Sequence, residues 1–546
     1  MNNEASKDKT GSFLLQGSIL AVAGIIVRLI GLIYKIPLTN YIGEAGIGVY
    51  NTAYNIYNIL LIVSSYSLPL AVSRLVAVRL AEGEYNNTRR LFICALFFAL
   101  ISGGVFGCVC LFGADFFASV LYMPQAALAI KTLAPTIFIM AFLGVLRGYF
   151  QGTGTMVPTA VSQIIEQIIH AVVSIVAGIW LFNIGAGIDF TGDTVDYYSS
   201  AYGAAGGTIG TGAGALAAFI VVFALYLKRR KSLMSKCHAV CDEKIAGYKD
   251  TMKVLIITIL PVLFSTCVYQ VCSIIDQGIY GQYMGSDYKT IWGAYSGKYL
   301  QLCHIPTAMA AALGSAVIPT LAADARKGNR TGLRSKTESA IRFNMFISIP
   351  AAVGLAVLAR PIMDMLFSSD NTLAAALMLM GSSAIVFTAI STISNSVLQG
   401  IGNIWIPVRN ALISLALHCA VLAALLWVFD AGIYGVVIAN IVFYILMTLF
   451  NQLSLRRILG YRQEIYKTFV SPFISSVIMG AVAYGLYALL HAHFGNTISA
   501  LTAIVIAVII YLELLILTKG ITEKELHEVR HGETLIRIFK KIHLMR

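Results

Sequence analysis

Residues 91–112 read LFICALFFALISGGVFGCVCLF, and this stretch decides the fold because it contains no charged side chain. As an α-helix it spans about 33 Å, which matches a hydrocarbon core about 30 Å thick. Similar apolar runs recur along the chain and predict an all-α, polytopic membrane protein with about 14 transmembrane helices. The predicted spans are residues 12–35, 46–72, 90–113, 127–149, 157–183, 205–227, 254–283, 291–319, 343–367, 373–398, 405–429, 432–454, 467–490 and 497–518.

The composition supports lipid as the solvent of this chain. Of its 546 residues, 58% are hydrophobic and 12% are charged, whereas a soluble protein carries about 25% charged residues. The net charge of +13 is spread over short loops and forms no basic domain, so we expect no nucleic-acid partner. Most of the cysteines lie in apolar runs, where they act as small buried hydrophobes. Cys237-His238-x-x-Cys241 lacks a second ligand pair at zinc-site spacing.

The basic loops predict the orientation. With the N-terminus inside, the loops on the cytoplasmic side carry Arg74, Arg79, Arg89, Arg90, Arg147, Lys228, Arg229, Arg230, Lys231, Arg326, Lys327, Arg330, Arg334, Lys336, Arg342, Arg409, Arg456, Arg457 and Arg462. The opposite loops carry Asp115, Asp189, Asp193, Asp196, Asp370 and Asp430 instead. Because basic loops stay inside, both termini are predicted to be cytoplasmic. The same loops would meet anionic membrane lipids, and Arg147 reads as a topology charge at the cytoplasmic rim.

An internal repeat predicts how the helices are grouped. Gln151-Gly152-Thr153-Gly154 is followed by Pro158, and Gln399-Gly400-Ile401-Gly402 is followed by Pro407, each at a turn between two spans. The turns are six spans apart, which favours two six-helix lobes over a chance recurrence of glycine-rich turns. The predicted parts are an N-terminal lobe (1–230), a cytoplasmic linker (231–252), a C-terminal lobe (253–458), two further helices (459–520) and a basic cytoplasmic tail (521–546).

Ionisable side chains inside the predicted spans are the candidate functional residues, because charge in a membrane is costly. The cations are Arg28 and Lys35 in the first span and Lys298 in the eighth. The carboxylates are Glu166 in the fifth and Asp276 in the seventh. Since Lys and Arg suit phosphate oxygens, we expect a cationic cavity for an anionic headgroup such as a pyrophosphate. The alternatives are ion pairs that lock helices together, and a Lys35 that snorkels to the surface.

Amide side chains accompany these charges. Asn51 and Asn55 share one face of the second span, and Gln163 lies one turn before Glu166. They are either ligands of the headgroup or polar contacts between helices. The sequence contains no phosphate-binding loop, no nucleophile elbow and no zinc-protease helix, so we expect neither an enzyme nor a cofactor. Residues 184–204 read as a flexible, acidic external loop.

Three segments carry a resemblance to a known family. They are Tyr34-Lys35-Ile36-Pro37-Leu38 with the following Ile42–Tyr50, then Ser67–Val76, and then Tyr149-Phe150-Gln151-Gly152 running into Pro158–Gln167. Together they resemble the stage V sporulation protein B and YtgP group, which includes the MurJ-type lipid II flippases. That group belongs to the multidrug/oligosaccharidyl-lipid/polysaccharide (MOP) exporter superfamily. The resemblance covers nearly the whole chain.

The resemblance implies two six-helix lobes around a cationic cavity, and two extra helices whose groove takes a lipid tail. It implies a flippase that moves lipid II across the bacterial inner membrane by alternating access. Lys298 and Arg28 match cavity arginines of the family, whereas Tyr34 stands where the family has another arginine and Lys35 compensates. A sodium site in some relatives makes Asp276, Asn410 and Ser414 candidate ligands, with Na⁺ or H⁺ as the coupling ion.

Three further functions stay open from the sequence. The chain could flip another lipid-linked glycan, or export cationic drugs as a cation-coupled antiporter, although the excess of cations in its spans disfavours the second. A non-transporting scaffold for sporulation or division is the third. Candidate protein partners are those of cell-wall synthesis or division.

Overall fold

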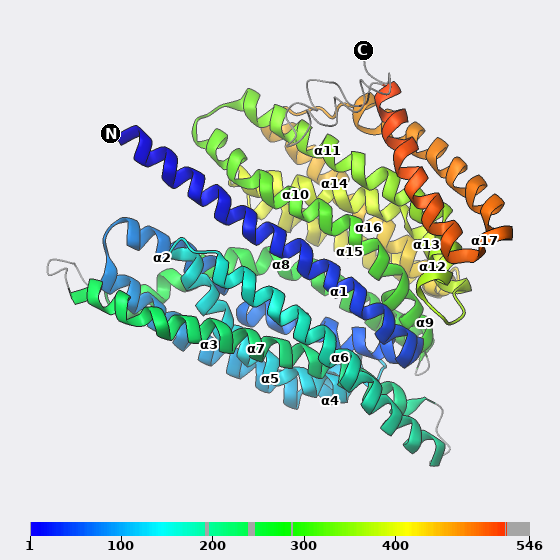
Figure 1. The fold of residues 1–546 in the computed structure, drawn as a ribbon, viewed down its shortest axis with the longest axis horizontal. Coiled ribbons are helices and arrows are strands. Elements are labelled where there is room, and N and C mark those ends of the chain that lie inside the picture. The colour runs from blue at the N-terminus through cyan, green and yellow to red at the C-terminus, as the bar shows by residue number, and fades with distance from the viewer. Residues whose placement is uncertain (1, 192–195, 239–245, 286–287, 519, 521–546) are drawn as a thin grey trace. The chain divides into compact units, whose positions relative to one another are not determined.

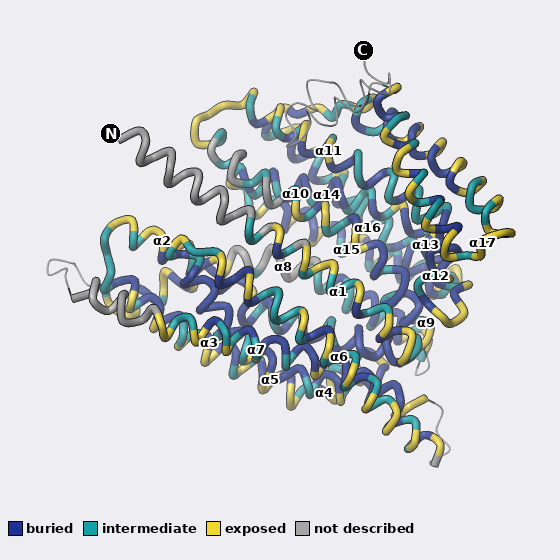
Figure 2. Tube along the Cα trace, in the orientation of Figure 1, coloured by how far each residue is buried: buried dark blue, intermediate teal, exposed yellow. Residues whose placement is uncertain are grey.

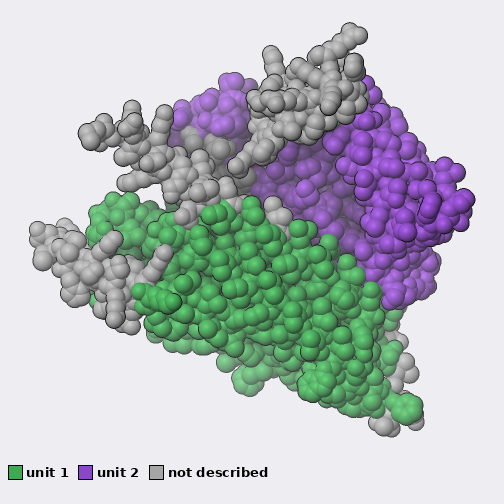
Figure 3. All heavy atoms as spheres, viewed as in Figure 1, with its two compact units in different colours: residues 1–297 green, residues 298–546 purple. Residues whose placement is uncertain are grey.

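The computed structural model describes residues 2–191, 196–238, 246–285, 288–518 and 520. In this part of the chain every regular element is a helix (Figure 1), which confirms the predicted all-α class. The helices form two compact units, residues 1–297 and 298–546 (Figure 3). The predicted lobe boundaries stay a prediction, since residues 239–245 of the linker and nearly all of the tail lie outside the described residues.

The first unit contains the helices up to Gly297, within the π-helical turn η2. They are α1 (Asn2–Leu61), η1 (Ile62–Tyr66), α2 (Leu68–Ala81), α3 (Tyr85–Phe112), α4 (Ala114–Val120), α5 (Ala126–Gly152), α6 (Val157–Thr191), α7 (Tyr197–His238), α8 (Tyr248–Met284), α9 (Lys289–Gly293) and most of η2 (Ala294–Tyr299). One core cluster joins α2, α3, α5, α7 and α8 around Leu68, Leu91 and Leu143.

The second unit begins with the end of η2. Its helices are α10 (Leu300–Arg326), α11 (Arg330–Val357), α12 (Ala359–Leu366), α13 (Thr372–Gly381), α14 (Ser383–Gly400), α15 (Trp405–Trp427), α16 (Gly432–Leu459), η3 (Tyr466–Val470) and α17 (Ser471–Leu517). Its core packs α10, α11, α14 and α16 around Leu321, Ile341 and Ile393. Exposed and buried residues alternate along α17 (Figure 2), as on a helix with one face on protein and one on lipid.

Nine of the described helices are long and apolar enough to cross a membrane, or up to ten if the bent pair α13 and α14 forms one span. The segments Val22–Ala81 and Tyr466–Leu517 contain 60 and 52 residues, or about 90 and 78 Å of helix, which is far more than one bilayer crossing needs. Each holds one break, at Gly43 (φ 72°, ψ 178°) and at Gly495 (φ 73°, ψ 176°). Both breaks fall between predicted spans, while the count of about 14 stays a prediction.

Glycine stripes set the closest helix contacts in the first unit. Gly206, Gly210 and Gly214 of α7 lie against the α6 backbone or side chains at Ala177, Ser174 and Glu166, where a Cβ would collide. Gly148 and Gly152 of α5 approach Pro69 and Val76 of α2 in the same way. Small residues one turn apart are the usual means of close packing between membrane helices.

The expected loop over 184–204 is wrong in most of its length. Helix α6 runs to Thr191 and α7 begins at Tyr197, so the two helices extend into this segment from its two ends (Figure 1). The physical reason is a side-chain cap at the start of α7, which composition alone does not reveal. Asp189 accepts hydrogen bonds from the backbone N–H of Tyr198 and Ser199, at 2.9 and 2.8 Å, and so satisfies the first turn of α7.

The two glycine-rich turns of the repeat have the same backbone structure. Gly154 and Gly402 both adopt positive φ, 82° and 89°. In the first turn Gly154 N donates to Gln151 O and Thr155 N to Phe150 O; in the second, Gly402 N donates to Gln399 O and Asn403 N to Leu398 O. The repeated sequence therefore encodes a repeated turn, the first between α5 and α6 and the second between α14 and α15.

Candidate functional site

A cavity of about 410 Å³ lies inside the first unit, between α1, η1, α2, α5 and α6. Its charged lining residues are Arg28, Arg147 and Glu166, and its polar ones include Gln151, Gln163 and Gln167. Two guanidinium groups and one carboxylate leave this lining with a net positive charge. Arg28, Glu166 and Gln163, all predicted site residues, therefore come together at one cavity.

Arg147 and Glu166 form an ion pair on the cavity wall. Arg147 Nη2 donates to Glu166 Oε2 at 2.7 Å, and their side chains are 9% and 23% exposed. Arg147 Nε donates to Ser162 Oγ at 3.0 Å, and the Ser162 hydroxyl in turn donates to Thr159 O at 2.8 Å. Three residues of α6, at one-turn spacing, thus orient one arginine of α5.

The interpretation of Arg147 as a rim charge is corrected by this geometry. The residue sits near the end of a predicted span, where a basic side chain normally marks the cytoplasmic surface. However, Arg147 is buried, and its guanidinium is bonded to Ser162 and Glu166 of α6. The sequence contains one indication of this ion pair. Arg147 precedes the Gln-Gly-x-Gly turn, which folds α6 back against α5 and so brings Glu166 within reach of Arg147.

Lys35 lies in a different environment from Arg28. Its Nζ is 5.6 Å from the ring centroid of Tyr50 and 5.7 Å from that of Tyr54, within cation–π range. Beside it, Tyr34 OH lies 3.1 Å from Tyr50 OH and 3.2 Å from His170 Nε2. Tyr34, the departure from the family pattern, is therefore part of a buried polar network, and Lys35 is not among the residues that line the cavity.

The asparagines of the second predicted span contact neighbouring helices. Asn51 donates to Ser296 Oγ at 3.2 Å and Asn55 donates to Ser273 Oγ at 3.4 Å. On the same helix, Thr52 Oγ1 accepts from Gln277 Nε2 at 2.5 Å. In this structure these amides join the second half of α1 to α8 and η2, which is the interhelical alternative considered for them.

Lys298 belongs to the second unit and is fully buried there. Its Nζ donates to Asn371 Oδ1 at 2.7 Å, to Ser369 Oγ at 2.8 Å and to Asp370 O at 3.4 Å. The Phe367 ring centroid is 5.5 Å away. The loop between α12 and α13 therefore holds this ammonium group, which sits in the π-helical turn η2, a type of irregularity often found at functional positions.

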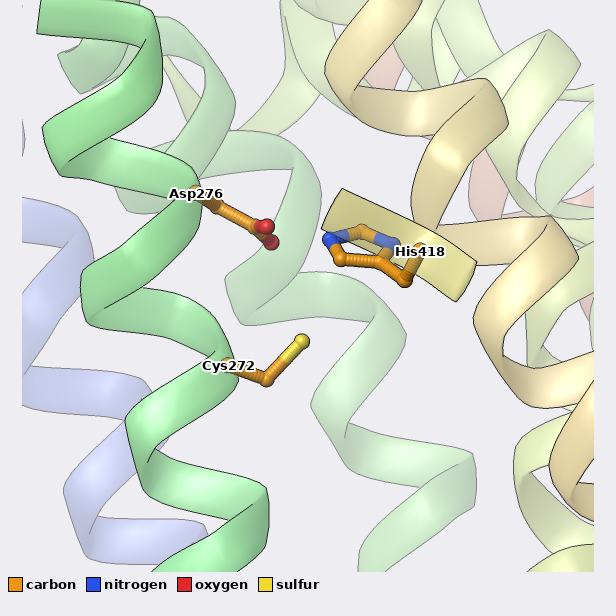
Figure 4. Close-up of side chains that lie close together, drawn as sticks. All are labelled: Cys272, Asp276 and His418. Atoms are coloured by element: carbon orange, nitrogen blue, oxygen red, sulfur yellow. The ribbon is translucent and has the colours of Figure 1, made fainter. Parts of the chain in front are cut away.

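Asp276 is buried on α8, one turn from Cys272, and the two side chains leave the helix on the same side (Figure 4). His418, also labelled there, lies on α15 of the second unit, with Nδ1 2.9 Å from Ala439 O. The remaining sodium candidates share this helix. Asn410 donates to Asn451 Oδ1 at 2.9 Å and accepts from Arg409 Nη2 at 3.2 Å. An amide oxygen that faces a guanidinium does not suit Na⁺, so Asn410 would have to turn to act as a ligand, and the sodium site stays a prediction.

Long apolar helices, two of them broken at a glycine, define a multi-pass membrane protein, and its first unit contains a polar, net cationic cavity. The chain belongs to the family described as polysaccharide biosynthesis protein, whose sequence model matches residues 14–324. A second model, MatE, matches residues 261–425. These comparisons connect the chain with transporters and not with enzymes.

The relatives match this chain over most of their lengths. "Lipid II flippase MurJ" of Bacillus subtilis (strain 168) is 24% identical over 491 residues, covering 86% of this chain and 87% of that protein. "Stage V sporulation protein B" of the same organism is 23% identical over 525 residues, covering 95% and 98%. A solved structure, "Lipid II flippase MurJ, inward closed conformation", superposes with a TM-score of 0.62 at 17% identity and covers 91% of this chain and 97% of that one.

Proposed function

We propose that this protein moves an undecaprenyl-pyrophosphate-linked peptidoglycan precursor, lipid II, from the inner to the outer leaflet by alternating access. The observation that supports the proposal is the cavity in which Arg28 and Arg147 reach the same space from two membrane helices. Placing two guanidinium groups at membrane depth is costly unless an anion offsets them. A pyrophosphate offers several acceptor oxygens in the geometry that guanidinium groups bind best.

In the proposed cycle, Arg28 captures the pyrophosphate from the cytoplasmic side. Lys298 is the cation that the second unit contributes at another stage, and Lys35 raises the positive potential along α1. The prenyl chain stays in lipid and follows α17. The membrane potential, worth about 2.3 kcal/mol per charge for each 100 mV, favours outward movement of a negative headgroup. Sodium or proton coupling stays a prediction, and no step of this cycle depends on it.

The proposed location is the bacterial inner membrane, with both termini in the cytoplasm. The basic loops support this orientation through the positive-inside rule. The proposed partners are the lipid-linked anionic precursor and anionic membrane lipids, with proteins of cell-wall synthesis or division as further candidates.

The test is rescue of a bacterium depleted of its own lipid II flippases. The wild-type chain should restore growth, and Arg28→Ala and Lys298→Ala at equal expression should not. Lys131→Ala is the control, because Lys131 is 40% exposed and pairs with Asp115 away from the cavity. Full rescue by both Arg28→Ala and Lys298→Ala would contradict the roles of these cations.

A second candidate function is the flipping of another lipid-linked glycan, favoured by the description of the matched family as polysaccharide biosynthesis. In that case the well-expressed wild-type chain does not rescue lipid II flippase depletion. The glycan that accumulates in a strain lacking the protein would then identify the substrate.

A further inference from the structure

The Arg147–Glu166 ion pair differs in its position from an ion pair that only joins two helices. Its two residues line the cavity proposed for the anionic headgroup, and the carboxylate is the more exposed member. A carboxylate and a phosphate are competing ligands for the same guanidinium. The pair is therefore placed where an incoming pyrophosphate meets a site that is already filled by an internal anion.

The anchoring of Arg147 does not depend on Glu166 alone. Ser162 holds Nε from one side, and the hydroxyl of Ser162 is itself fixed by Thr159 O. Within the described residues the hydrogen bonds of Arg147 use only Nε and Nη2, although the guanidinium has five N–H donors. The group would stay oriented toward the cavity if the Glu166 carboxylate moved away, with donors ready for a new acceptor.

We infer that Glu166 is a resident counter-ion that a pyrophosphate displaces from Arg147 on binding and that reclaims Arg147 on release. This inference rests on the proposed function and extends it. In the empty cavity, the carboxylate offsets the buried arginine, which would otherwise be a costly unpaired charge. With pyrophosphate bound, Arg28 and Arg147 share the ligand, and the freed carboxylate repels it, which favours its departure.

The pair therefore has opposite effects on binding and turnover. Glu166 weakens capture, because the ligand must compete with it, and it speeds release. Removing its charge should tighten ligand binding and slow the transport cycle. A purely structural ion pair predicts something else, namely a loss of stability with no gain in affinity for an anion.

The experiment is a titration of inorganic pyrophosphate into the purified full chain at constant ionic strength. Glu166→Gln should bind about tenfold more tightly than wild type, equivalent to about 1.4 kcal/mol. Adding Arg147→Gln in the same chain should abolish that gain. The matched control is Glu338→Gln, because Glu338 accepts from Arg342 Nη2 at 2.9 Å in a similar pair in the second unit, and neither residue lines the cavity. Its affinity for pyrophosphate should equal that of wild type.

An unchanged or weaker affinity in a folded Glu166→Gln protein would overturn the inference. If that variant is not stably produced, Glu166→Asp keeps the charge and withdraws it by one methylene. It should still bind pyrophosphate more tightly than wild type, and an equal affinity would count against the counter-ion role.

The rescue assay separates this inference from the proposed function. If Glu166→Gln binds pyrophosphate more tightly but the wild-type chain does not rescue lipid II flippase depletion, the counter-ion exchange is supported and lipid II as the substrate is contradicted. If the wild-type chain rescues depletion and Glu166→Gln has the same affinity for pyrophosphate as wild type, lipid II as the substrate is supported and the counter-ion exchange is contradicted. With both correct, Glu166→Gln binds more tightly yet rescues less well than wild type.

Discussion

The cations Arg147, Lys298 and Lys35 differ in the groups that surround them. Arg147 is oriented by a carboxylate and a hydroxyl, whereas Lys298 is held by a hydroxyl, an amide and a backbone carbonyl. Lys35 faces aromatic rings. In the proposed cycle, the ligand displaces a carboxylate from the Arg147 guanidinium.

Glu464 provides a residue-level prediction about stability and pH. Its Oε1 accepts from Lys467 N at 2.9 Å, and its Oε2 accepts from Thr468 N at 2.9 Å and Thr468 Oγ1 at 3.0 Å, at the start of the last helical segment. Partial burial raises the pKa of Glu464, but these hydrogen bonds outweigh it and hold the pKa below its ordinary value. Glu464→Gln should lower the free energy of unfolding by about 1 kcal/mol at pH 7.

The pH dependence follows from that lowered pKa. The folded-state pKa lies below the unfolded value of about 4.3, so the stabilisation is complete above the unfolded value and disappears as pH falls through the folded value. Unfolding of wild type and Glu464→Gln in detergent should therefore converge in acid. Glu82→Gln, at an exposed carboxylate, is the control. A difference that persists unchanged in acid would contradict the capping role.

Among the individual residues, Arg28, Glu166 and Gln163 were predictable as a group lining one space. Helical periodicity placed Gln163 and Glu166 on one face, and the cost of charge in lipid selected Arg28 and Glu166. Arg147 was not predictable as a lining residue, because its position near the end of a span fits a topology charge as well as a site residue. Only the packing of α5 against α2 and α6 decides between the two, and no local pattern encodes which helices meet.

For the helices, the apolar runs predicted the elements well and their ends less well. The breaks at Gly43 and Gly495 fall where the predicted spans are separated. By contrast, the acidic stretch over 184–204 suggested a loop, and α6 and α7 extend into it. The Asp189 cap accounts for the difference, since composition records an acidic residue but not the N–H groups that it satisfies.

The contact between α6 and α7 gives a prediction at this scale. A Cβ at Gly206 would collide with backbone atoms of Ala177 and Gly178, which cannot move aside as a flexible side chain can. Gly206→Ala should destabilise the protein by about 1–3 kcal/mol. Gly104→Ala on α3 is the matched control, because no atom lies within 4 Å of its added Cβ.

Unfolding of both glycine variants in detergent, followed by helical circular dichroism, measures the difference. Gly104→Ala should be as stable as wild type or slightly more so, since alanine favours helix. Equal stability of Gly206→Ala and Gly104→Ala would show that α6 and α7 do not pack as closely as described.

At the scale of the whole molecule, the all-α membrane class was predictable from the recurring apolar runs and the composition, and the repeated turn from two short motifs. The number of crossings follows less directly. Nine or ten of the described helices qualify as spans, and two of the long segments each contain a glycine break but are counted once. The length of the segments settles part of the number of crossings, since about 90 Å of helix cannot be one crossing of a bilayer about 30 Å thick.

The central claim is that this chain carries a lipid-linked pyrophosphate across a bilayer, and translocation in proteoliposomes tests it most directly. Purified protein is reconstituted with fluorescent lipid II, and a membrane-impermeant quencher reports the fraction of label in the outer leaflet over time. The account predicts that wild-type protein moves label between leaflets faster than protein-free liposomes, and that Arg28→Ala does so much more slowly. A folded wild-type protein that exchanges lipid II no faster than empty liposomes, under an imposed membrane potential as well as without one, would contradict it.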